Sequence, residues 1–564
     1  MRISTETSRA KAVAVAVVFS LAAHSLLLFC DYQVWDGIIY DRCFEGQVGI
    51  SSMWRLFQEA GRPLDMLIYA FLHQIGPSGI VGKFVGLIAW ASIIGLITSS
   101  LCRLQAMPLP IAAAIGCVSG TLPVFGMLGD FTFAMHCVCV LLFWMGILFF
   151  SRSATSYGMK AVGARLLSLS CLFVSFNLSS LLMFFYACLV AAVILRRPSN
   201  LSFSYLSRLS LRHADFLLLP ILFWIIKTSF TPTSGYYASY NQPSLSASVL
   251  TAALQATWSD FLLSHLQRAA GVMVATGVVV ACGTLIFKRI VPSGYAKAAV
   301  CTIDARLGGR VMLAGAILLA GAVIPYFAVG QAITVDGWTS RNAILTPLPV
   351  SMLMVGIIII ISTTVFRSMR LAWLLGVLVV ALSGTLLTST NYLVLQGLGA
   401  KQVSLERKLK SSLVELRPTV VQLRDYFTIP RSIAYYPPLV WTCFAVEKGQ
   451  DIKTLIFDIA QQLPYQTKLD EQGQPQILFP HVPMTSQLLV QMLEQTTMPY
   501  MLQSIPRTGP QMMLVVQPGK YGSDGMALGA RYLWVKWFNP DGLPEFLDQA
   551  TETHVLELPP VTSA

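Results

Sequence analysis

The feature that most constrains this chain is a succession of apolar runs separated by short loops. Most of the runs approach or reach the roughly 17–25 residues that an α-helix needs to cross a hydrocarbon core of about 30 Å. We therefore expect a polytopic α-helical membrane bundle with about 10–13 transmembrane helices. The runs lie at residues 12–30, 84–101, 107–128, 131–150, 166–195, 214–230, 269–287, 311–329, 347–366 and 371–389.

The composition supports a membrane environment. Of 564 residues, 55% are hydrophobic and 12% are charged, which is too little charge to cover a water-soluble particle of this size. The net charge of +12 would raise the question of nucleic acid in a soluble protein. Here the basic residues sit mainly in short loops and form no stripe interleaved with aromatic residues, so we expect no nucleic-acid partner.

The basic loops also predict the orientation of the helices. Arg2, Arg9 and Lys11 precede the first run, which favours a cytoplasmic N-terminus, although a cleaved signal peptide is the alternative. Further clusters of Lys and Arg follow the runs that end near residues 150, 195, 287 and 366. With these clusters in the cytoplasm, loops 31–65, 231–268 and 328–346 lie on the opposite side, together with everything after residue 390.

Two segments allow more than one interpretation. The run 166–195 is long for one span and carries Ser175, Asn177, Ser179 and Ser180 at its middle, which favours a helical hairpin over one long tilted helix. The segment 64–76 fits either a short span or a helix lying at the membrane interface.

The composition changes after residue 390, where charges and prolines become frequent and apolar runs shorten. We divide the chain into a transmembrane domain, 1–390, and a small soluble α/β domain, 391–564. Within the second domain the patterns predict helices at 402–428 and 486–494 and strands at 512–516 and 530–537.

The first loop, 31–65, concentrates negative charge. It holds six of the twelve Asp and Glu residues that precede residue 392. Asp36, Asp41 and Glu45 alternate with aromatic residues such as Trp35. A carboxylate beside an aromatic ring at a membrane surface suits a sugar hydroxyl held for deprotonation, whereas a merely solvated loop is the alternative.

Other residues on the same side could complete a sugar-phosphate site. Arg62 and Arg341 each offer a planar fork of donors for a phosphate group, or else anchor the chain at the lipid headgroups. Tyr236, Tyr237 and Trp338 offer stacking surfaces for sugar rings, or else belong to an interfacial aromatic belt.

The arrangement of Asp36 and Asp41 in the first loop, followed by Gly61, Arg62, Pro63 and Leu64, resembles the GT-C glycosyltransferases, most closely the bacterial O-antigen glucosyltransferases. The resemblance covers about the first 230 residues. It implies a multi-pass protein of the bacterial inner membrane with its C-terminal domain in the periplasm. The paired DxD motif of some members is missing, so the need for a divalent cation stays open.

The resemblance also implies an activity. An inverting transfer would move a sugar from a polyprenyl-phosphate-linked donor to a glycan acceptor of the cell envelope, such as lipopolysaccharide. Asp36 would act as general base, Asp41 as its helper, and Glu45 with the two arginines and the aromatic residues would bind substrate. The alternatives are a secondary transporter and a non-catalytic protein of envelope assembly.

Overall fold

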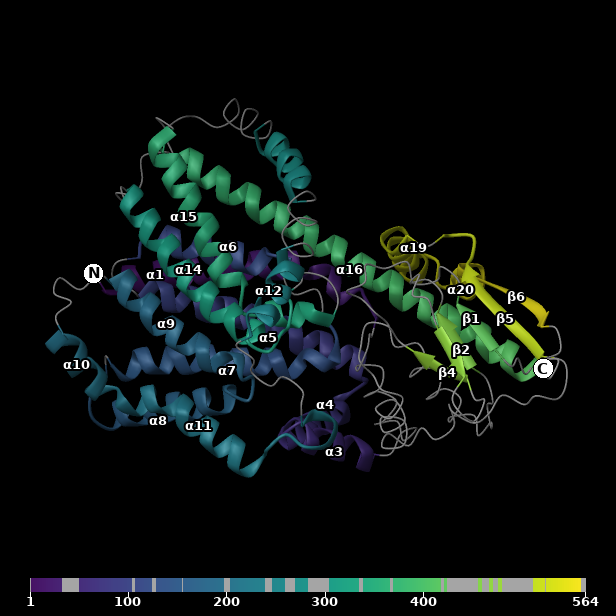
Figure 1. Ribbon diagram of the computed structural model, residues 1–564. Helices are drawn as coiled ribbons and strands as arrows, with labels where there is room; N and C mark the ends of the chain where they lie inside the picture. Colours follow the sequence, from purple (N-terminus) through teal and green to yellow (C-terminus); the bar gives the residue numbers. More distant parts are fainter. Residues whose placement is uncertain are drawn as a thin grey trace.

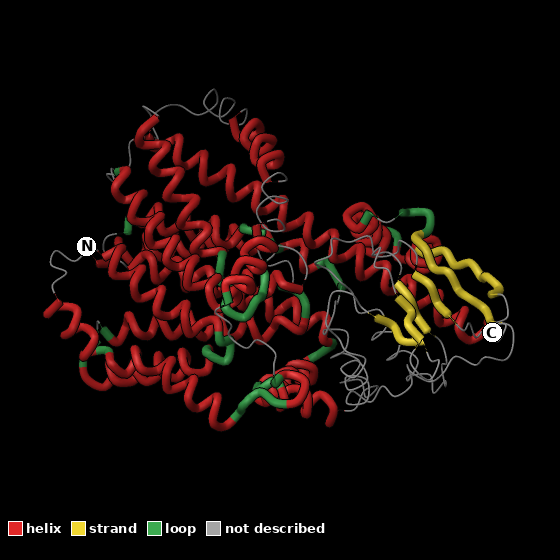
Figure 2. Tube along the Cα trace, viewed as in Figure 1, coloured by secondary structure: helices red, strands yellow, loops and turns green. Residues whose placement is uncertain are grey.

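The structure is a computed structural model of residues 1–564 (Figures 1 and 2). It describes residues 2–32, 50–103, 107–123, 128–154, 156–196, 203–238, 246–258, 269–281, 304–333, 338–365, 369–416, 420–423, 455–458, 466–469, 475–478, 511–522 and 524–558. Helices form a bundle, and the strands gather beyond the end of the bundle that lies opposite to the N-terminus (Figure 1).

Six helices in the described part of the chain are long and apolar enough to cross a membrane, so the protein is a helical membrane bundle. They comprise Ser78–Arg103, Phe131–Ser153, Gly158–Ser175, Ala305–Phe327, Pro347–Thr364 and Trp373–Leu405. Shorter apolar helices, among them Leu109–Thr121 and Ser180–Arg196, pack with these. A total of ten or more spans stays a prediction.

Most of the apolar runs that precede residue 366 fall on helices, and shorter helices such as Ile50–Glu59 and Phe203–Arg212 form outside them; the apolar helix Ala269–Ala281 is described as well. In chain order the other helices that precede residue 366 are α1 Arg2–Ala23, η1 Ser25–Leu28, α3 Ile50–Glu59, α4 Pro63–Ile75, α5 Ser78–Arg103, α6 Leu109–Thr121, η2 Phe131–Phe133, α7 Ala134–Ser153, α8 Gly158–Ser175, α9 Ser180–Arg196, α10 Phe203–Arg212, α11 Ala214–Phe230, η3 Gly235–Tyr237, α12 Ala247–Ala256, α14 Ala305–Phe327, η6 Trp338–Ala343 and α15 Pro347–Val365.

The hairpin predicted within 166–195 is confirmed, because α8 ends at Ser175 and α9 begins at Ser180. The hydroxyl of Ser175 donates to the carbonyl of Leu172 at 2.7 Å, and the backbone N–H of Leu178 donates to the carbonyl of Ser175 at 3.1 Å. These contacts satisfy carbonyls that the end of a helix leaves without intrahelical partners. The polar residues in the middle of the run therefore mark a turn.

Helices α3 and α4 meet at a tight turn around Gly61, which has φ +66°. A Cβ there would come within 2.6 Å of the Thr231 carbonyl oxygen, so the position requires glycine. Pro63 then begins α4, as proline commonly does at a first helical position. The 13 residues of α4 span only about 20 Å, too short to cross the membrane. Its exposed face carries apolar residues, namely Leu64, Leu67, Phe71 and Ile75.

Helix α16, Met369–Leu416, is 48 residues and about 72 Å long, and its C-terminal part extends out of the bundle (Figure 1). It passes residue 390 as one unbroken helix. The helix predicted at 402–428 is thus confirmed as far as Leu416 and wrong beyond it, because Val420–Leu423 form strand β1.

The strands β1 Val420–Leu423, β2 Leu455–Asp458, β5 Gln511–Pro518 and β6 Thr551–Leu558 pair in the order β2-β1-β5-β6. The β1–β2 and β1–β5 pairs are parallel, and the β5–β6 pair is antiparallel. Strands β3 Gln466–Leu469 and β4 Pro475–Leu478 form a separate antiparallel pair. The predicted strand at 512–516 is confirmed by β5.

Two helices, α19 Gly525–Phe538 and α20 Leu543–Ala550, connect β5 to β6. The strand predicted at 530–537 is wrong, since these residues belong to α19. Asp524 starts that helix: its carboxylate accepts hydrogen bonds from the backbone N–H groups of Met526 and Ala527 at 2.9 and 3.2 Å. The helix predicted at 486–494 lies outside the described residues.

Candidate functional site

The predicted site residues divide into two groups. Asp36, Asp41, Glu45 and Trp35 lie outside the described residues, and for Tyr236 and Trp338 the description covers the backbone alone. Arg62, Arg341 and Tyr237 are described together with their side chains. The site is therefore built from these three residues and from what surrounds them.

Several helix ends that are far apart in the sequence come together where α4 begins. We call this the α4 end of the bundle. The amide of Asn177, in the α8–α9 turn, donates to the Asp65 carboxylate of α4 at 2.5 Å. Lys227, in the last turn of α11, donates to the Ser179 hydroxyl at 2.9 Å. Tyr326, near the end of α14, donates to the Ser180 hydroxyl at 3.1 Å. The α4 end thus joins polar groups from four helices and one turn.

A buried carboxylate occupies the centre of this arrangement. Asp65 has a side-chain exposure of 1%, and its Oδ2 forms an ion pair with Nη2 of Arg62 at 2.7 Å. Asp65 lies in the first turn of α4, where the helix dipole also favours a negative charge. Arg62 is the residue before the helix, so the sharp turn at Gly61 and the start at Pro63 fix both partners.

Three cations lie in this region, and we call Arg62, Lys227 and Arg341 the cationic cluster. Lys227 lies within electrostatic range of both Arg62 and Asp65. Arg62 and Arg341 both act on the imidazole of His136 and on the phenol of Tyr326. The two arginines proposed from sequence therefore both lie within electrostatic range of His136 and Tyr326.

His136 is a further member of the site. It lies in the first turn of α7, and its ring packs against Phe133 with centroids 5.5 Å apart. Among the described residues its Nδ1 is buried and has no hydrogen-bond partner. A buried nitrogen without a hydrogen-bond partner is unfavourable, because it has given up its hydrogen bond to water and gained none in the protein. A ligand oxygen held between Arg62 and Arg341 would be close to this nitrogen.

Tyr237 lies at the rim of the same region. It ends η3, whose preceding residue Ser234 donates its backbone N–H to the Glu59 carbonyl of α3 at 2.9 Å. Its side chain is partly exposed. The segment after α11 is thus attached to the α3–α4 pair that carries Arg62. This attachment holds Tyr237 near that pair.

Sequence reasoning missed Asp65, Lys227, His136 and Asn177 as site residues. Each has a signal in the sequence: a charged or polar residue at the end of an apolar run, on the side assigned to the first loop. Asp65 was also one of the six acids of that loop. Only the fold shows that these run ends meet.

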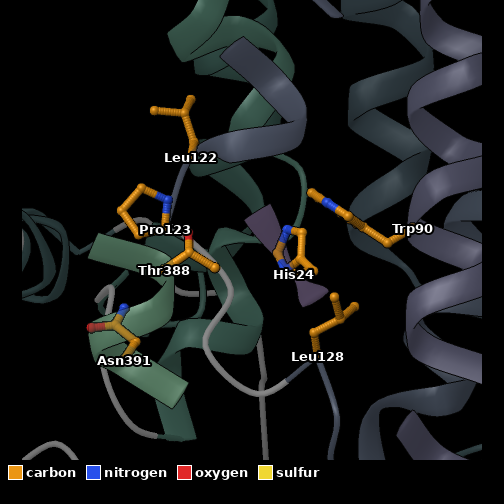
Figure 3. A pocket seen from close by; sticks show the side chains of 7 residues that line it. All are labelled: His24, Trp90, Leu122, Pro123, Leu128, Thr388 and Asn391. Atoms are coloured by element: carbon orange, nitrogen blue, oxygen red, sulfur yellow. The ribbon is translucent and has the colours of Figure 1, made fainter. Parts of the chain in front are cut away.

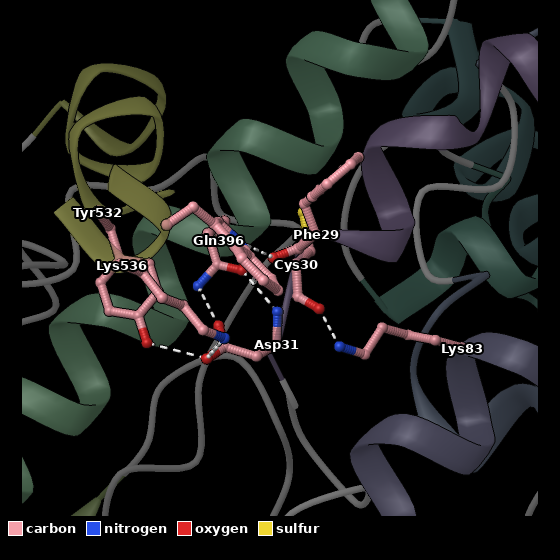
Figure 4. A network of polar contacts seen from close by, with 8 residues as sticks. Phe29, Cys30, Asp31, Lys83, Gln396, Tyr532 and Lys536 are labelled. Atoms are coloured by element: carbon pink, nitrogen blue, oxygen red, sulfur yellow. Dashed lines mark hydrogen bonds and ion pairs between the residues drawn. The ribbon is translucent and has the colours of Figure 1, made fainter. Parts of the chain in front are cut away.

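A second polar network lies where the bundle meets α19 (Figure 4). Asp31 Oδ2 accepts from Lys536 Nζ at 2.6 Å and from the Tyr532 hydroxyl at 2.9 Å. Asp31 Oδ1 accepts from the Gln396 amide at 2.7 Å. Burial, and then the neighbouring Asp31 charge, raise the pKa of Tyr532, which keeps its hydroxyl a donor. This network joins the chain just before the first loop to α16 and α19.

A small pocket is also present at the end of α6 (Figure 3). His24 lines it together with Trp90, Thr388 and Asn391. The His24 ring is already satisfied, with Nδ1 2.5 Å from the Tyr392 hydroxyl and Nε2 3.1 Å from the Gly120 carbonyl. We therefore assign His24 a packing role.

In the part of the chain that the structure describes, no group of three or more His, Cys, Asp or Glu side chains could hold a metal ion. Asp36, Asp41 and Glu45 lie outside that part, so the dependence on a divalent cation stays open.

Comparisons with protein-family models, with curated proteins and with solved structures find no match for this chain.

Proposed function

We propose that the chain is a membrane glycosyltransferase that uses a polyprenyl-phosphate-linked sugar as donor. The observation that supports this most is the convergence of Arg62, Lys227 and Arg341 at the α4 end of the bundle. Arginine binds phosphate through a fork of donors, and lysine adds a compact positive charge. The exposed apolar face of α4 lies next to Arg62, where the isoprenoid chain of such a donor would be accommodated.

In the proposed reaction a hydroxyl of the glycan acceptor attacks the anomeric carbon of the donor sugar. The bond between that carbon and the phosphate oxygen breaks, and the phosphate leaves with an additional negative charge. The cationic cluster would stabilise that charge as it develops. Asp36 would take the proton of the attacking hydroxyl, with Asp41 as its helper. Attack on the face opposite to the phosphate gives inversion.

The first loop is well anchored for this role. It leaves the bundle after Tyr32, which is buried, and returns at α3. Asp36 follows Tyr32 by four residues, a reach of roughly 14 Å at most for an extended chain. Glu45, Trp35, Tyr236, Tyr237 and Trp338 would hold the sugar and the acceptor.

Transfer is expected to depend on Asp36. The Asp36→Asn protein keeps the shape of the side chain and loses its charge, so the rate of glycan modification should fall by about two to four orders of magnitude. Near wild-type modification by Asp36→Asn together with an inactive Asp41→Asn would transfer the role to Asp41. If both variants remained active, the first loop would not be the catalytic site.

The donor also requires a particular orientation in the membrane. We propose the bacterial inner membrane, with a cytoplasmic N-terminus and residues 391–564 forming a small α/β domain in the periplasm. An alkaline phosphatase fused to the C-terminus should then be active, and a fluorescent protein fused there should be dark. The reverse pattern would contradict both the topology and the lipid-linked donor.

A further inference from the structure

Helix α19 has two different faces. Leu528, Gly529, Tyr532 and Leu533 are buried and follow the spacing of one helical stripe. The opposite stripe includes three large aromatic side chains that remain exposed: Trp534 at 63%, Trp537 at 51% and Phe538 at 71%. Trp534 and Phe538 stack on each other with centroids 4.6 Å apart. A soluble domain rarely presents such a contiguous aromatic surface to water.

The buried face of α19 holds it closely against α16. Gly525 and Gly529 are four residues apart and face Gly397 and the Leu393 carbonyl of α16. A Cβ at Gly529 would come within 1.9 Å of that carbonyl oxygen, so the two backbones are in direct contact. Small residues at this spacing are typical of helices that pack together in membranes.

The position of α19 along the bundle is fixed by the residues that follow α1 and η1. The indole N–H of Trp537 donates to the Phe29 carbonyl at 3.2 Å, and the two rings meet edge to face at 5.8 Å. Lys536 pairs with Asp31 at 2.6 Å (Figure 4). Leu28 and Phe29 are themselves exposed apolar residues of that segment. The aromatic face of α19 therefore continues a surface that already faces lipid.

We propose that the exposed face of α19 is a membrane-binding surface that lies in the interfacial layer of the bilayer. Indole rings combine an apolar body with a polar N–H, which suits the boundary between acyl chains and headgroups. Arg531 flanks the aromatic residues and is exposed, so its guanidinium is available to anionic headgroups. The occupant is the lipid of the same membrane that the bundle spans, and the inference does not depend on the enzymatic activity proposed above.

The experiment measures the depth of α19 in a bilayer that contains the full chain. A fluorescent amino acid is introduced at Trp534 in one protein and at Ala530 in a second, so that one of the two keeps every aromatic residue. A matched control carries the same label at His554, which is exposed on β6, away from the bundle. Each protein is reconstituted in nanodiscs with lipids brominated on the upper acyl chain, and iodide serves as the aqueous quencher.

Emission from positions 534 and 530 should be lost with brominated lipids and retained with iodide. Emission from position 554 should show the opposite response. The proposal is overturned if iodide quenches positions 534 and 530 while brominated lipid does not, because the face would then be in water. It is also overturned if both quenchers fail there, because protein, either a second copy or another partner, would then cover the face.

Discussion

Two carboxylates lie at the two ends of the first loop, and their surroundings differ. Asp31, the first residue of the loop, has a side-chain exposure of 34% and contacts Lys536, Tyr532 and Gln396. Asp65, its last residue, has a side-chain exposure of 1%, pairs with Arg62 and lies within electrostatic range of Lys227. The first carboxylate joins two parts of the chain at a partly exposed position, whereas the second is buried beside two cations.

The difference separates a structural contact from a candidate binding site. Around Asp31, Lys536 forms an ion pair, Lys83 lies within electrostatic range, and the hydrogen bonds of both oxygens are satisfied. Around Asp65, Arg62 forms an ion pair with a carboxylate that is almost completely buried, and Lys227 lies within electrostatic range of both. Charges interact more strongly in a low-dielectric region than at an exposed site, so the two carboxylates differ mainly in burial.

The largest effect is expected for Asp65→Asn. Loss of the buried charge leaves Arg62 and Lys227 repelling each other, so the free energy of unfolding should fall by about 3 kcal/mol. The matched variant Asp31→Asn removes a partly exposed pair and should cost about 1 kcal/mol or less. Thermal unfolding of the detergent-solubilised proteins compares the two. Equal losses would mean that the two carboxylates have the same role, which would break the comparison.

A smaller effect is expected for Gly529→Ala at the α16–α19 contact. The added methyl group must push the two helices apart, which costs about 1–3 kcal/mol locally. Ala527→Leu adds more bulk on an exposed position of the same helix and is the control. Limited proteolysis should cut residues 525–550 sooner in the Gly529→Ala protein and at the wild-type rate in the control. Unchanged protection in both would show that the contact with α16 does not hold α19.

Much of the transmembrane domain could be predicted from the sequence, because the signals for its helices and turns lie within single short segments. Apolar length predicts spanning helices, and the polar residues Ser175 to Ser180 predict the break between α8 and α9. Arg62 was predicted from its position at the entry of an apolar run, and Arg341 from its place in the loop 328–346 on the same side. Asp65, Lys227 and His136 were missed as site residues. They lie on different helices, and whether these helices bring them together depends on packing that the sequence pattern does not show.

The strand predicted at 530–537 shows where sequence pattern fails. The segment Arg531–Phe538 contains several aromatic residues and Val535, and these residue types are common in strands. The Asp524 cap and the glycines at 525 and 529 favour a helix instead. Apolar residues cover both faces of α19 because one face packs on α16 and the other, as proposed, lies in lipid. That double burial removed the amphipathic period that would have identified a helix.

The central claim is that the cationic cluster binds the phosphate of a lipid-linked donor. The most direct test is to titrate the purified full-length chain with polyprenyl phosphate and to measure binding by native mass spectrometry. Lys227→Gln and Arg341→Gln should each weaken binding about tenfold, since each removes a charge-assisted contact worth roughly 1.5 kcal/mol. Arg407→Gln, which removes only an exposed pair with Asp548, should bind like the wild type. Equal affinity of all four proteins, or equal binding of the unphosphorylated polyprenol, would contradict the account.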